Sequence, residues 1–226
     1  MKTMKIQYML AALLAGCLAT VSASAGTYSN ITIDGNFSDW AGVPVLFTDA
    51  TGDGSPIDLG TIQLANDANN LYIRLTYPTA VNPQSGAGVF LAIDNDNNPA
   101  TGFDVYGLGL VGSEAGWQND FPFEQANGNF NTGGGITGGA ALISPYNTST
   151  TEQEYSISRS ATFTDSGLPV FPGNSFTLLV YTTEATADVA GPVTYEFAAV
   201  PEPATLTLVG LGLLMMLGIT RRRNRS

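Results

Sequence analysis

The stretch NDANNLYIRLTY, residues 66–77, gives the first indication of how this chain folds. From Leu71 to Tyr77 apolar side chains occupy alternate positions, a period of two that is typical of a half-buried β-strand. The Asn and Asp cluster at 66–70 is a turn signal, because these side chains bond to their own backbone. The stretch therefore predicts a hairpin turn followed by an antiparallel strand.

The same alternation recurs between turn-forming residues. It predicts further strands at 43–47, 58–65, 88–94, 105–111, 139–144, 154–158, 176–182 and 193–197. No stretch between them shows sustained helical periodicity with caps. Many short strands separated by Gly, Pro, Asn and Asp favour an all-β protein, an antiparallel β-sandwich. The Gly-rich stretch 127–139 lacks the Gly-Lys-Ser/Thr of a phosphate loop and predicts a long loop.

The first 25 residues predict a secretory signal peptide. Two lysines precede an apolar run at 6–21, and Ala23-Ser24-Ala25 forms a small-x-small cleavage site. An alternative is a lipoprotein box at residues 14–17, in which Cys17 is lipidated. Since Cys17 is the single cysteine, cleavage after Ala25 leaves a protein without thiols or disulfides.

The last 27 residues, 200–226, have three ordered parts. A Pro-Glu-Pro triplet precedes the uncharged apolar run 204–220, and arginines follow it. A helix over this run is about 25 Å long, close to the thickness of a bilayer core. The arginines belong in the cytoplasm by the positive-inside rule. The tail thus predicts a transmembrane helix over 204–220 with the preceding chain exported.

This tail resembles the PEP-CTERM sorting signal of Gram-negative bacteria that form biofilms. The residues that carry the resemblance are Pro201, Glu202, Pro203, Arg221, Arg222 and Arg223. The resemblance implies that an exosortase-type membrane protease is a partner and cuts near the triplet. The protein would be anchored in the inner membrane before processing and then pass to the cell surface or extracellular matrix. The alternative is a plain anchor that is never processed.

The charge of the ectodomain, residues 26–199, limits its partners. It holds 18 of the 19 acidic residues but only two of the 8 basic ones, Arg74 and Arg159, for a formal net charge of −16. Such a surface disfavours nucleic acid and anionic lipid, and it suits cations, neutral glycans or simple solubility. The chain has no histidine, which removes Ser-His-Asp catalysis and the usual zinc sites.

An acidic loop follows the predicted strand 88–94. Oxygen-bearing side chains recur there, and such hard ligands suit Ca²⁺. The predicted ligands are Asp94, Asp96, Asn98, Thr101 and Asp104. The loop is not an EF-hand, because Pro99 stands where that motif needs glycine. The alternative is a surface turn that binds nothing. A second acidic loop, residues 49–53 with Asp58, could also hold a cation, but a plain turn is favoured there.

The two tryptophans have different expected roles. Trp40 precedes a strand and is expected to pack in the core. Trp117 lies in a loop-like setting with Gln118, Asn119 and Asp120, so these four residues are candidates for binding a sugar by stacking and hydrogen bonds. For Trp117 itself, ordinary packing is favoured over a sugar platform.

Several blocks of the ectodomain together resemble the family 9 carbohydrate-binding module and its DOMON-like relatives. They are residues 33–35 with 38–40, the hairpin 65–72, the loop 92–102 and the strand 154–159. The resemblance implies a β-sandwich of jelly-roll type, in many relatives with structural calcium and attachment to extracellular polysaccharide enzymes. A paired-aromatic sugar clamp is not matched. The haem-binding branch is excluded, since the ectodomain has neither methionine nor histidine.

These features predict a non-catalytic, exported protein that binds exopolysaccharide or another glycan with a calcium-stabilised fold. The alternative is a structural biofilm-matrix protein with no specific small ligand. A third hypothesis is a glycoside hydrolase, which needs two carboxylates facing one cleft. Its candidates by residue type are Glu114, Asp120, Glu124 and Glu154.

Overall fold

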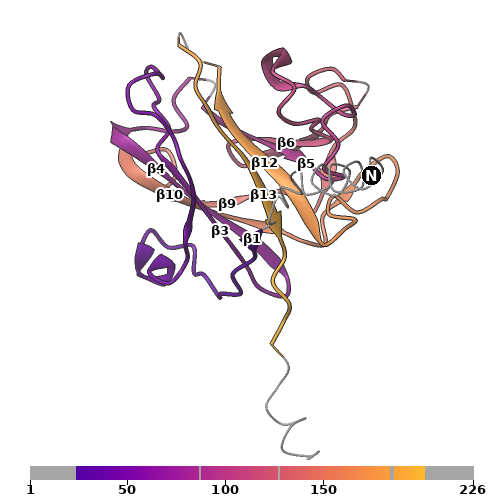
Figure 1. The fold of residues 1–226 in the computed structure, drawn as a ribbon, viewed down its shortest axis with the longest axis horizontal. Helices are drawn as coiled ribbons and strands as arrows, with labels where there is room; N and C mark the ends of the chain where they lie inside the picture. The colour runs from indigo at the N-terminus through magenta and orange to yellow at the C-terminus, as the bar shows by residue number, and fades with distance from the viewer. Residues whose placement is uncertain (1–23, 87, 127, 184–185, 202–226) are drawn as a thin grey trace, which may run out of the picture.

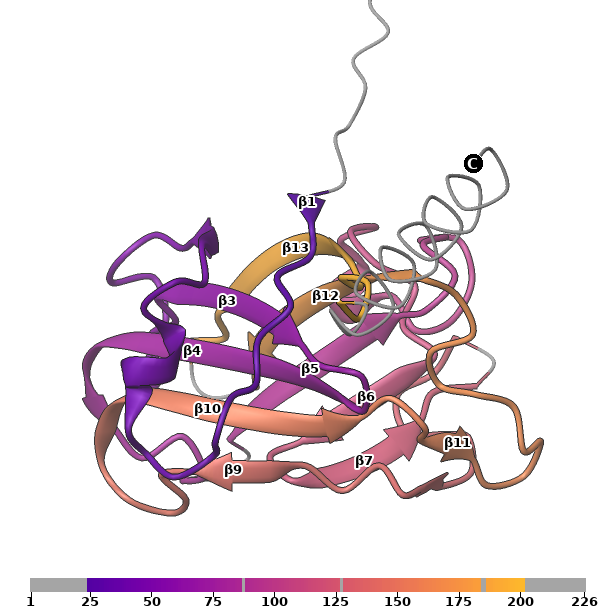
Figure 2. The ribbon, with the colours of Figure 1, turned by 90° about the horizontal axis from the view of Figure 1, so that it is seen from below.

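The computed structural model describes residues 24–86, 88–126, 128–183 and 186–201. It contains two packed β-sheets, seen edge-on in Figure 1 and from below in Figure 2. The strands pair antiparallel except at β1, which pairs parallel with β13. The prediction of an all-β antiparallel sandwich is confirmed for this part of the chain.

The first sheet has six strands. Its order is β1 (Ser24–Ala25), β13 (Val189–Glu196), β12 (Ser175–Thr182), β5 (Val89–Asp94), β6 (Ala115–Gln118) and β7 (Phe121–Glu124). The second sheet has five, in the order β2 (Val45–Thr48), β3 (Thr61–Asn66), β4 (Asn70–Val81), β10 (Thr150–Ser158) and β9 (Leu142–Ser144). Two short strands, β8 (Ile136–Thr137) and β11 (Thr162–Phe163), pair with each other.

The hairpin between β3 and β4 forms as predicted. The backbone nitrogen of Asp67 donates to the carbonyl of Asn70 at 3.1 Å. The Asp67 carboxylate in turn accepts from the backbone nitrogens of Asn69 and Asn70, at 2.7 and 2.6 Å. A side chain that satisfies two turn donors fixes the hairpin, so β4 runs beside β3 and presents its apolar positions to one face.

The main core lies between the two sheets. Alternate residues of β4, β5 and β12 point into it, among them Ile73, Leu91 and Leu178, each at most 1% exposed. Because side chains alternate along a strand, the remaining residues of the same strands point outward. The apolar side chains of the two sheets thus form one core layer that holds the sheets against each other.

Both outer faces are also covered. On the five-stranded sheet, Trp40 of the short 3₁₀ helix η1 (Phe37–Trp40) packs near Ala65 and Tyr72. On the six-stranded sheet, Phe90 and Leu179 pack with Val105, which lies in the chain after β5. The segment that leaves β5 therefore folds back over its own sheet.

Several details of the predicted elements are wrong. The predicted loop 127–139 contains the short strand β8, and β10 and β13 begin at Thr150 and Val189, before the predicted 154 and 193. Residues 105–111 form the 3₁₀ turn η2 (Val105–Gly107) and a loop; Tyr106, Gly107 and Gly109 have φ of 55°, 68° and 65°, which a strand does not allow. The β6–β7 hairpin was not predicted, because its residues do not alternate cleanly. The strands predicted from 58 and 139 begin at Thr61 and Leu142 instead.

All three apolar clusters lie within residues 31–197. A segment with its own complete core folds as a unit, so residues 26–200 are expected to fold without the flanking segments. The predicted cleavage after Ala25 falls directly after β1, whose two residues pair with Tyr195 and Glu196.

Two predicted segments lie outside the described residues: the signal peptide, except its last two residues, and the helix 204–220. So do the sorting-signal residues Glu202, Pro203, Arg221, Arg222 and Arg223. None of the helices among the described residues could span a bilayer.

Candidate functional site

Three carboxylates converge at the end of β5. Each of Asp94, Asp96 and Glu114 offers an oxygen that lies within 4.8 Å of the others. Asp94 ends β5, and Glu114 immediately precedes β6, the antiparallel neighbour of β5. Strand pairing therefore brings Glu114 to a loop that lies twenty positions earlier in the chain. Sequence reasoning named Glu114 only as a hydrolase candidate, and no local signal placed it beside Asp94.

Backbone donors hold these carboxylates in place. Asp94, 1% exposed, accepts from the nitrogens of Asn98 at 3.0 Å and Gly112 at 3.2 Å. Glu114 Oε2 accepts from the nitrogen of Asn95 at 3.0 Å, whereas its buried Oε1 has no hydrogen-bond partner among the described residues. An oxygen without a donor inside a fold is unfavourable unless a cation or water satisfies it.

Burial also changes the acidity of the cluster. Desolvation, followed by the charges of Asp96 and Asp94, raises the pKa of Glu114 to about 7. Desolvation raises the pKa of Asp94 as well, against the hydrogen bonds from Gly112 and Asn98. A divalent cation would neutralise this repulsion, and oxygen ligands of this kind suit Ca²⁺.

One of the predicted calcium ligands, Asp104, is placed elsewhere. Asp104 is not part of the cluster; its Oδ1 accepts from the nitrogen of Gly109 at 2.8 Å and closes the η2 turn. Asn98 lies beside the cluster, since its backbone nitrogen donates to Asp94 Oδ1 at 3.0 Å and to Asp96 Oδ1 at 2.9 Å. Its amide oxygen accepts from the nitrogen of Ala100 at 3.2 Å. Thr101 does belong with the cluster, since its hydroxyl donates to the Asp96 carboxylate at 3.2 Å.

A groove of about 530 Å³ opens beside the cluster. Its polar lining comes from Asp96, Thr101, Glu114, Glu124 and Gln125, and its apolar lining includes Phe163, Leu168, Pro169 and Pro172. The Gln125 side chain is 1% exposed; its Nε2 donates to Ser113 Oγ at 2.8 Å, while its Oε1 has no donor in the described structure. The groove thus combines two buried, unpartnered oxygens with an acidic wall.

The predicted sugar platform at Trp117 is wrong. Trp117 is 0% exposed, belongs to the core between the sheets, and donates from Nε1 to the carbonyl of Gly139 at 2.7 Å. What looked like a loop is the β6–β7 hairpin, and Asn119 and Asp120 form its turn, Asn119 with φ 54°. Gln118 lies half-buried at the end of β6. A buried ring cannot stack on a ligand.

Trp40 packs in the core as predicted, and its indole also hydrogen-bonds to Glu154. Its indole nitrogen donates to Glu154 Oε2 at 2.9 Å, while Glu154 Oε1 accepts from the nitrogens of Asp34 at 2.9 Å and Gly35 at 2.8 Å. Glu154 is 0% exposed. Of the hydrolase candidates, Glu154 is therefore structural, whereas Glu114 and Glu124 line the same groove.

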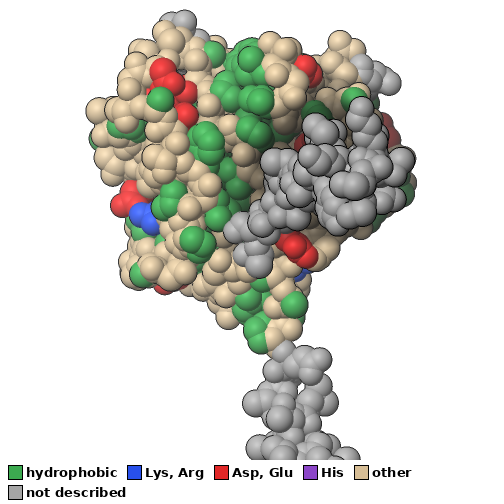
Figure 3. Space-filling model, in the orientation of Figure 1, with side chains coloured by type: hydrophobic (Ala, Val, Ile, Leu, Met, Phe, Trp, Pro, Cys, Tyr) green, Lys and Arg blue, Asp and Glu red, His purple; other side chains and the backbone are tan. Residues whose placement is uncertain are grey.

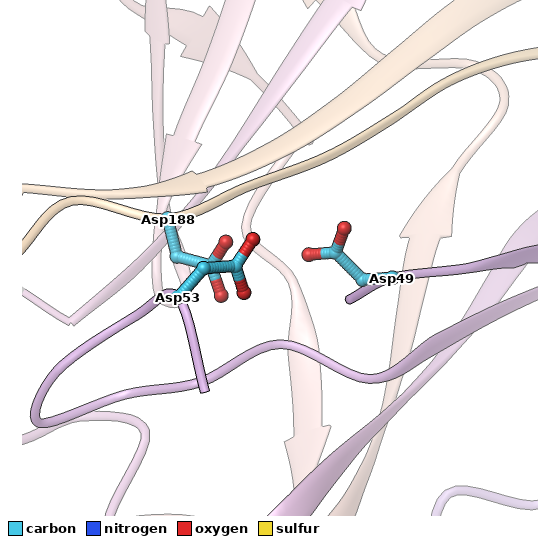
Figure 4. Close-up of side chains that lie close together, drawn as sticks. All are labelled: Asp49, Asp53 and Asp188. Atoms are coloured by element: carbon cyan, nitrogen blue, oxygen red, sulfur yellow. The ribbon is translucent and has the colours of Figure 1, made fainter. Parts of the chain in front are cut away.

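A second carboxylate cluster consists of Asp49, Asp53 and Asp188. Figure 4 shows Asp53 and Asp188 close together, with the Asp49 carboxylate facing them from the other side. Burial, then the charge of Asp188, raises the pKa of Asp49 to about 6. Asp58 instead holds the turn by accepting from the nitrogens of Gly52 and Gly54, as expected. Asp188 lies just before β13, far along the chain from Asp49, so no local pattern groups the two residues.

The surface of the domain reflects its excess of acidic over basic residues. On the face drawn in Figure 3, red acidic atoms occur in several places, and blue basic atoms are scarce. Among the described residues, the recorded ion pair is Arg74 with Glu152.

Comparison with known proteins gives one match by sequence and several by structure. Residues 199–224 match the model of the PEP-CTERM protein-sorting motif. The chain therefore carries this sorting signal, which implies an exported protein that an exosortase processes. No curated protein matches the chain significantly.

Among solved structures, the chain is similar to a family 9 carbohydrate-binding module from Caldicellulosiruptor kristjanssonii in complex with cellotriose. The identity is 14%, the TM-score 0.46, and the match covers 79% of this chain and 94% of that one. The same kind of module in complex with glucose matches with 14% identity and a TM-score of 0.45, over 79% and 97% of the two chains. At this level nothing about the site is transferred from those modules.

Proposed function

We propose that this protein is an exported, exosortase-processed surface or matrix protein that is not an enzyme, and that it binds a glycan in the groove beside a calcium ion. The observation that carries the proposal is the convergence of Asp94, Asp96 and Glu114 at the wall of that groove. The three carboxylates therefore lie at the edge of the groove, so a bound calcium ion would be next to a bound glycan.

The predicted ligands would leave part of the calcium coordination sphere open. Ca²⁺ takes about six to eight oxygens. The cluster supplies three carboxylates, with the Thr101 hydroxyl beside Asp96. Asp94 is buried, but Asp96 is exposed and lines the groove. The remaining coordination positions would therefore face the groove, where sugar hydroxyls can fill them.

The rest of the groove suits a polyhydroxyl ligand. The oxygens of Glu124 and Gln125 can accept hydrogen bonds from hydroxyls, and Leu168 and Pro169 offer apolar surface to a sugar ring. Small-molecule sites combine these two kinds of lining. No tryptophan contributes, so affinity for a single sugar should be modest and rise with repeated units.

Calcium and glycan binding can be tested with purified residues 26–200. Isothermal titration with Ca²⁺, followed by pull-down on a panel of soluble and insoluble polysaccharides with calcium or with EDTA, measures both. The proposal requires calcium binding and retention on at least one polysaccharide that EDTA abolishes. Calcium binding without retention on any polysaccharide would rule out the glycan part and leave a metal-stabilised fold.

A structural matrix protein with no small ligand is the second candidate. The burial of both Trp40 and Trp117 favours it, because neither ring is available to a sugar. A folded domain that binds no polysaccharide would support this candidate. Hydrolysis is the third outcome: Glu114, whose pKa is raised to about 7, and Glu124 share one groove, so release of reducing ends from a retained polysaccharide would show an enzyme.

Sorting is tested separately in cells. With Pro201, Glu202 and Pro203 all changed to alanine in the full chain, the protein should accumulate uncut in the membrane fraction. The wild-type chain should appear shortened at the surface or in the matrix. Equal processing of both chains would contradict cleavage guided by the triplet.

A further inference from the structure

A second hollow, of about 300 Å³, lies where the end of β10 meets the β3–β4 hairpin. It shares no lining residue with the groove. Its polar side chains are Asn69, Ser158, Arg159 and Ser160, and its aromatic ones are Phe171 and Phe197. In an acidic domain, this hollow is lined by an arginine and by no acidic residue.

The structure holds the Arg159 side chain in a fixed orientation. The Arg159 backbone nitrogen donates to the carbonyl of Asn69, and its Nη1 donates to the carbonyl of Asp67, both at 2.8 Å. The guanidinium carbon lies 4.1 Å from the centroid of the Phe197 ring. Phe197 itself packs on Phe171, with ring centroids 5.5 Å apart. A guanidinium stacked on an aromatic face keeps its plane, so its remaining donors point in set directions.

The Arg159 guanidinium pairs with no carboxylate among the residues that the structure describes, where the recorded ion pair belongs to Arg74. Asp67, whose carbonyl accepts from Arg159, turns its carboxylate to the nitrogens of Asn69 and Asn70 and to the Tyr72 hydroxyl. A guanidinium has five N–H donors in a planar fork that fits a carboxylate. Arg159 uses one of them on the Asp67 carbonyl.

We propose that this hollow binds the carboxylate of an acidic sugar, such as a uronate unit of a polysaccharide. Arg159 takes the carboxylate. The hydroxyls of Ser158 and Ser160 and the amide of Asn69 bond to ring hydroxyls, and Phe171 provides an apolar edge. The hollow is at the small end of the range for ligand sites, which suits one sugar unit. The inference narrows the glycan of the proposed function to an acidic one and rests on that function for the class of ligand.

One segment of the chain lines both hollows. Leu168, Pro169 and Pro172 face the groove, and Phe171 and Gly173 face the hollow at Arg159. Calcium in the groove would offset most of the negative charge of its three carboxylates, while the Arg159 guanidinium is positive on the other side of residues 168–173. An acidic polymer is repelled by the domain as a whole, but charges are screened beyond about 8 Å at physiological salt, so local positive centres decide where it binds.

The test is an NMR titration of ¹⁵N-labelled residues 26–200 with D-glucuronate, D-glucose, inorganic phosphate and tetraglutamate, each with EDTA present. With EDTA present, calcium-dependent binding in the groove is abolished, so any remaining binding reports on the hollow at Arg159. A negative result here is therefore distinct from a failure of the proposed calcium-dependent function. Glucuronate should shift the Arg159 Nε–H signal and the amides of Asn69 and residues 158–160. Equal shifts with glucose, tighter binding of phosphate or tetraglutamate, or no shift at Arg159 would each overturn the proposal.

Variants with matched charge complete the test. Arg159→Gln should weaken glucuronate binding by about tenfold or more, since a charged hydrogen-bonded pair is lost. Arg74→Gln removes the same charge outside the hollow and should leave affinity within about twofold. Arg159→Lys keeps the charge but not the fork; if Arg159→Gln fails to fold, Arg159→Lys should still bind several-fold more weakly than wild type. Equal loss in Arg74→Gln, or full affinity in Arg159→Lys, would reject the arginine fork.

Discussion

The carboxylate of Glu154 accepts a hydrogen bond from the indole nitrogen of Trp40 at 2.9 Å, and both side chains are buried. The same carboxylate accepts from the backbone nitrogens of Asp34 and Gly35. Glu154 lies in β10, in the middle of the chain, and the other three residues lie in the N-terminal segment. A single buried charge thus ties the N-terminal segment to the outer face of the five-stranded sheet.

Glu154→Gln should destabilise the domain by about 2–4 kcal/mol, because the new amide presents a donor where Trp40 donates and the charged hydrogen bonds are lost. Urea unfolding of residues 26–200 measures this. Glu152→Gln is the matched control on the same strand; its half-buried pair with Arg74 should contribute about 1 kcal/mol or less. Equal costs for the two variants would contradict the structural role of Glu154.

Calcium binding should depend on Glu114 and Asp96 and be indifferent to Asp104. Glu114→Gln or Asp96→Asn removes a ligand charge, so calcium affinity should fall by about tenfold or more. Asp104→Asn should bind calcium like the wild type, because Asp104 closes the η2 turn outside the cluster. Calorimetric titration distinguishes these outcomes. Loss of affinity in Asp104→Asn with normal binding in Glu114→Gln would favour the ligand set expected from sequence.

Asp49 should make stability depend on pH near neutrality. Its pKa is raised from 3.8 to about 6 in the folded domain, so the folded state holds this proton more tightly than the unfolded state. This contribution to the free energy of unfolding is therefore largest below pH 4 and is lost as pH rises through 6. Asp49→Asn should remove that part of the dependence and raise stability at pH 8 by about 1 kcal/mol, after allowance for solvent screening.

Chemical denaturation with EDTA at several pH values between 4 and 8 checks the Asp49 prediction. Asp53→Asn is the control, since Asp53 is exposed in the same cluster and should change stability less. A slope that is unchanged in Asp49→Asn would show that other groups titrate in this range.

Trp117 should matter for stability and not for ligands. Trp117→Ala leaves a cavity between the sheets and should cost about 3–5 kcal/mol. Phe121, 64% exposed in the adjacent strand β7, provides the comparison, and Phe121→Ala should change stability little. Any polysaccharide retained by the wild type should be retained equally by Trp117→Phe at a temperature where that variant is folded. Selective loss of retention in Trp117→Phe would restore the sugar-platform hypothesis.

Wild-type fluorescence gives a check of the same burial without mutation. Both tryptophans are at most 1% exposed, so iodide should quench their emission weakly until the domain unfolds. Strong quenching of the native domain would contradict the placement of Trp40 or Trp117.

Short-range patterns allowed much of the fold to be predicted. Alternation at 71–77 identified β4, and the Asn and Asp cluster before it identified the hairpin, because both effects act within a few residues of the chain. The sorting tail was recognised for the same reason: its triplet, apolar run and arginines are contiguous, and residues 199–224 match the sorting motif. The sequence by itself thus determined the strand class, the hairpin and the export of this protein.

The tertiary structure decided what those patterns could not. Glu114 reaches its cluster because β6 pairs with β5. Asp188, just before β13, meets Asp49 and Asp53 from the other sheet, where an isolated bridge joins Ser55 and Thr186. Composition around Trp117 is that of a loop, yet hydrogen bonding between β6 and β5 turns the ring into the core. Arg159 is stacked on Phe197 because the ends of β10 and β13 meet. The local charge, the ligand geometry and the exposure of a side chain depend on its neighbours in space. The periodicity of the sequence does not specify those neighbours.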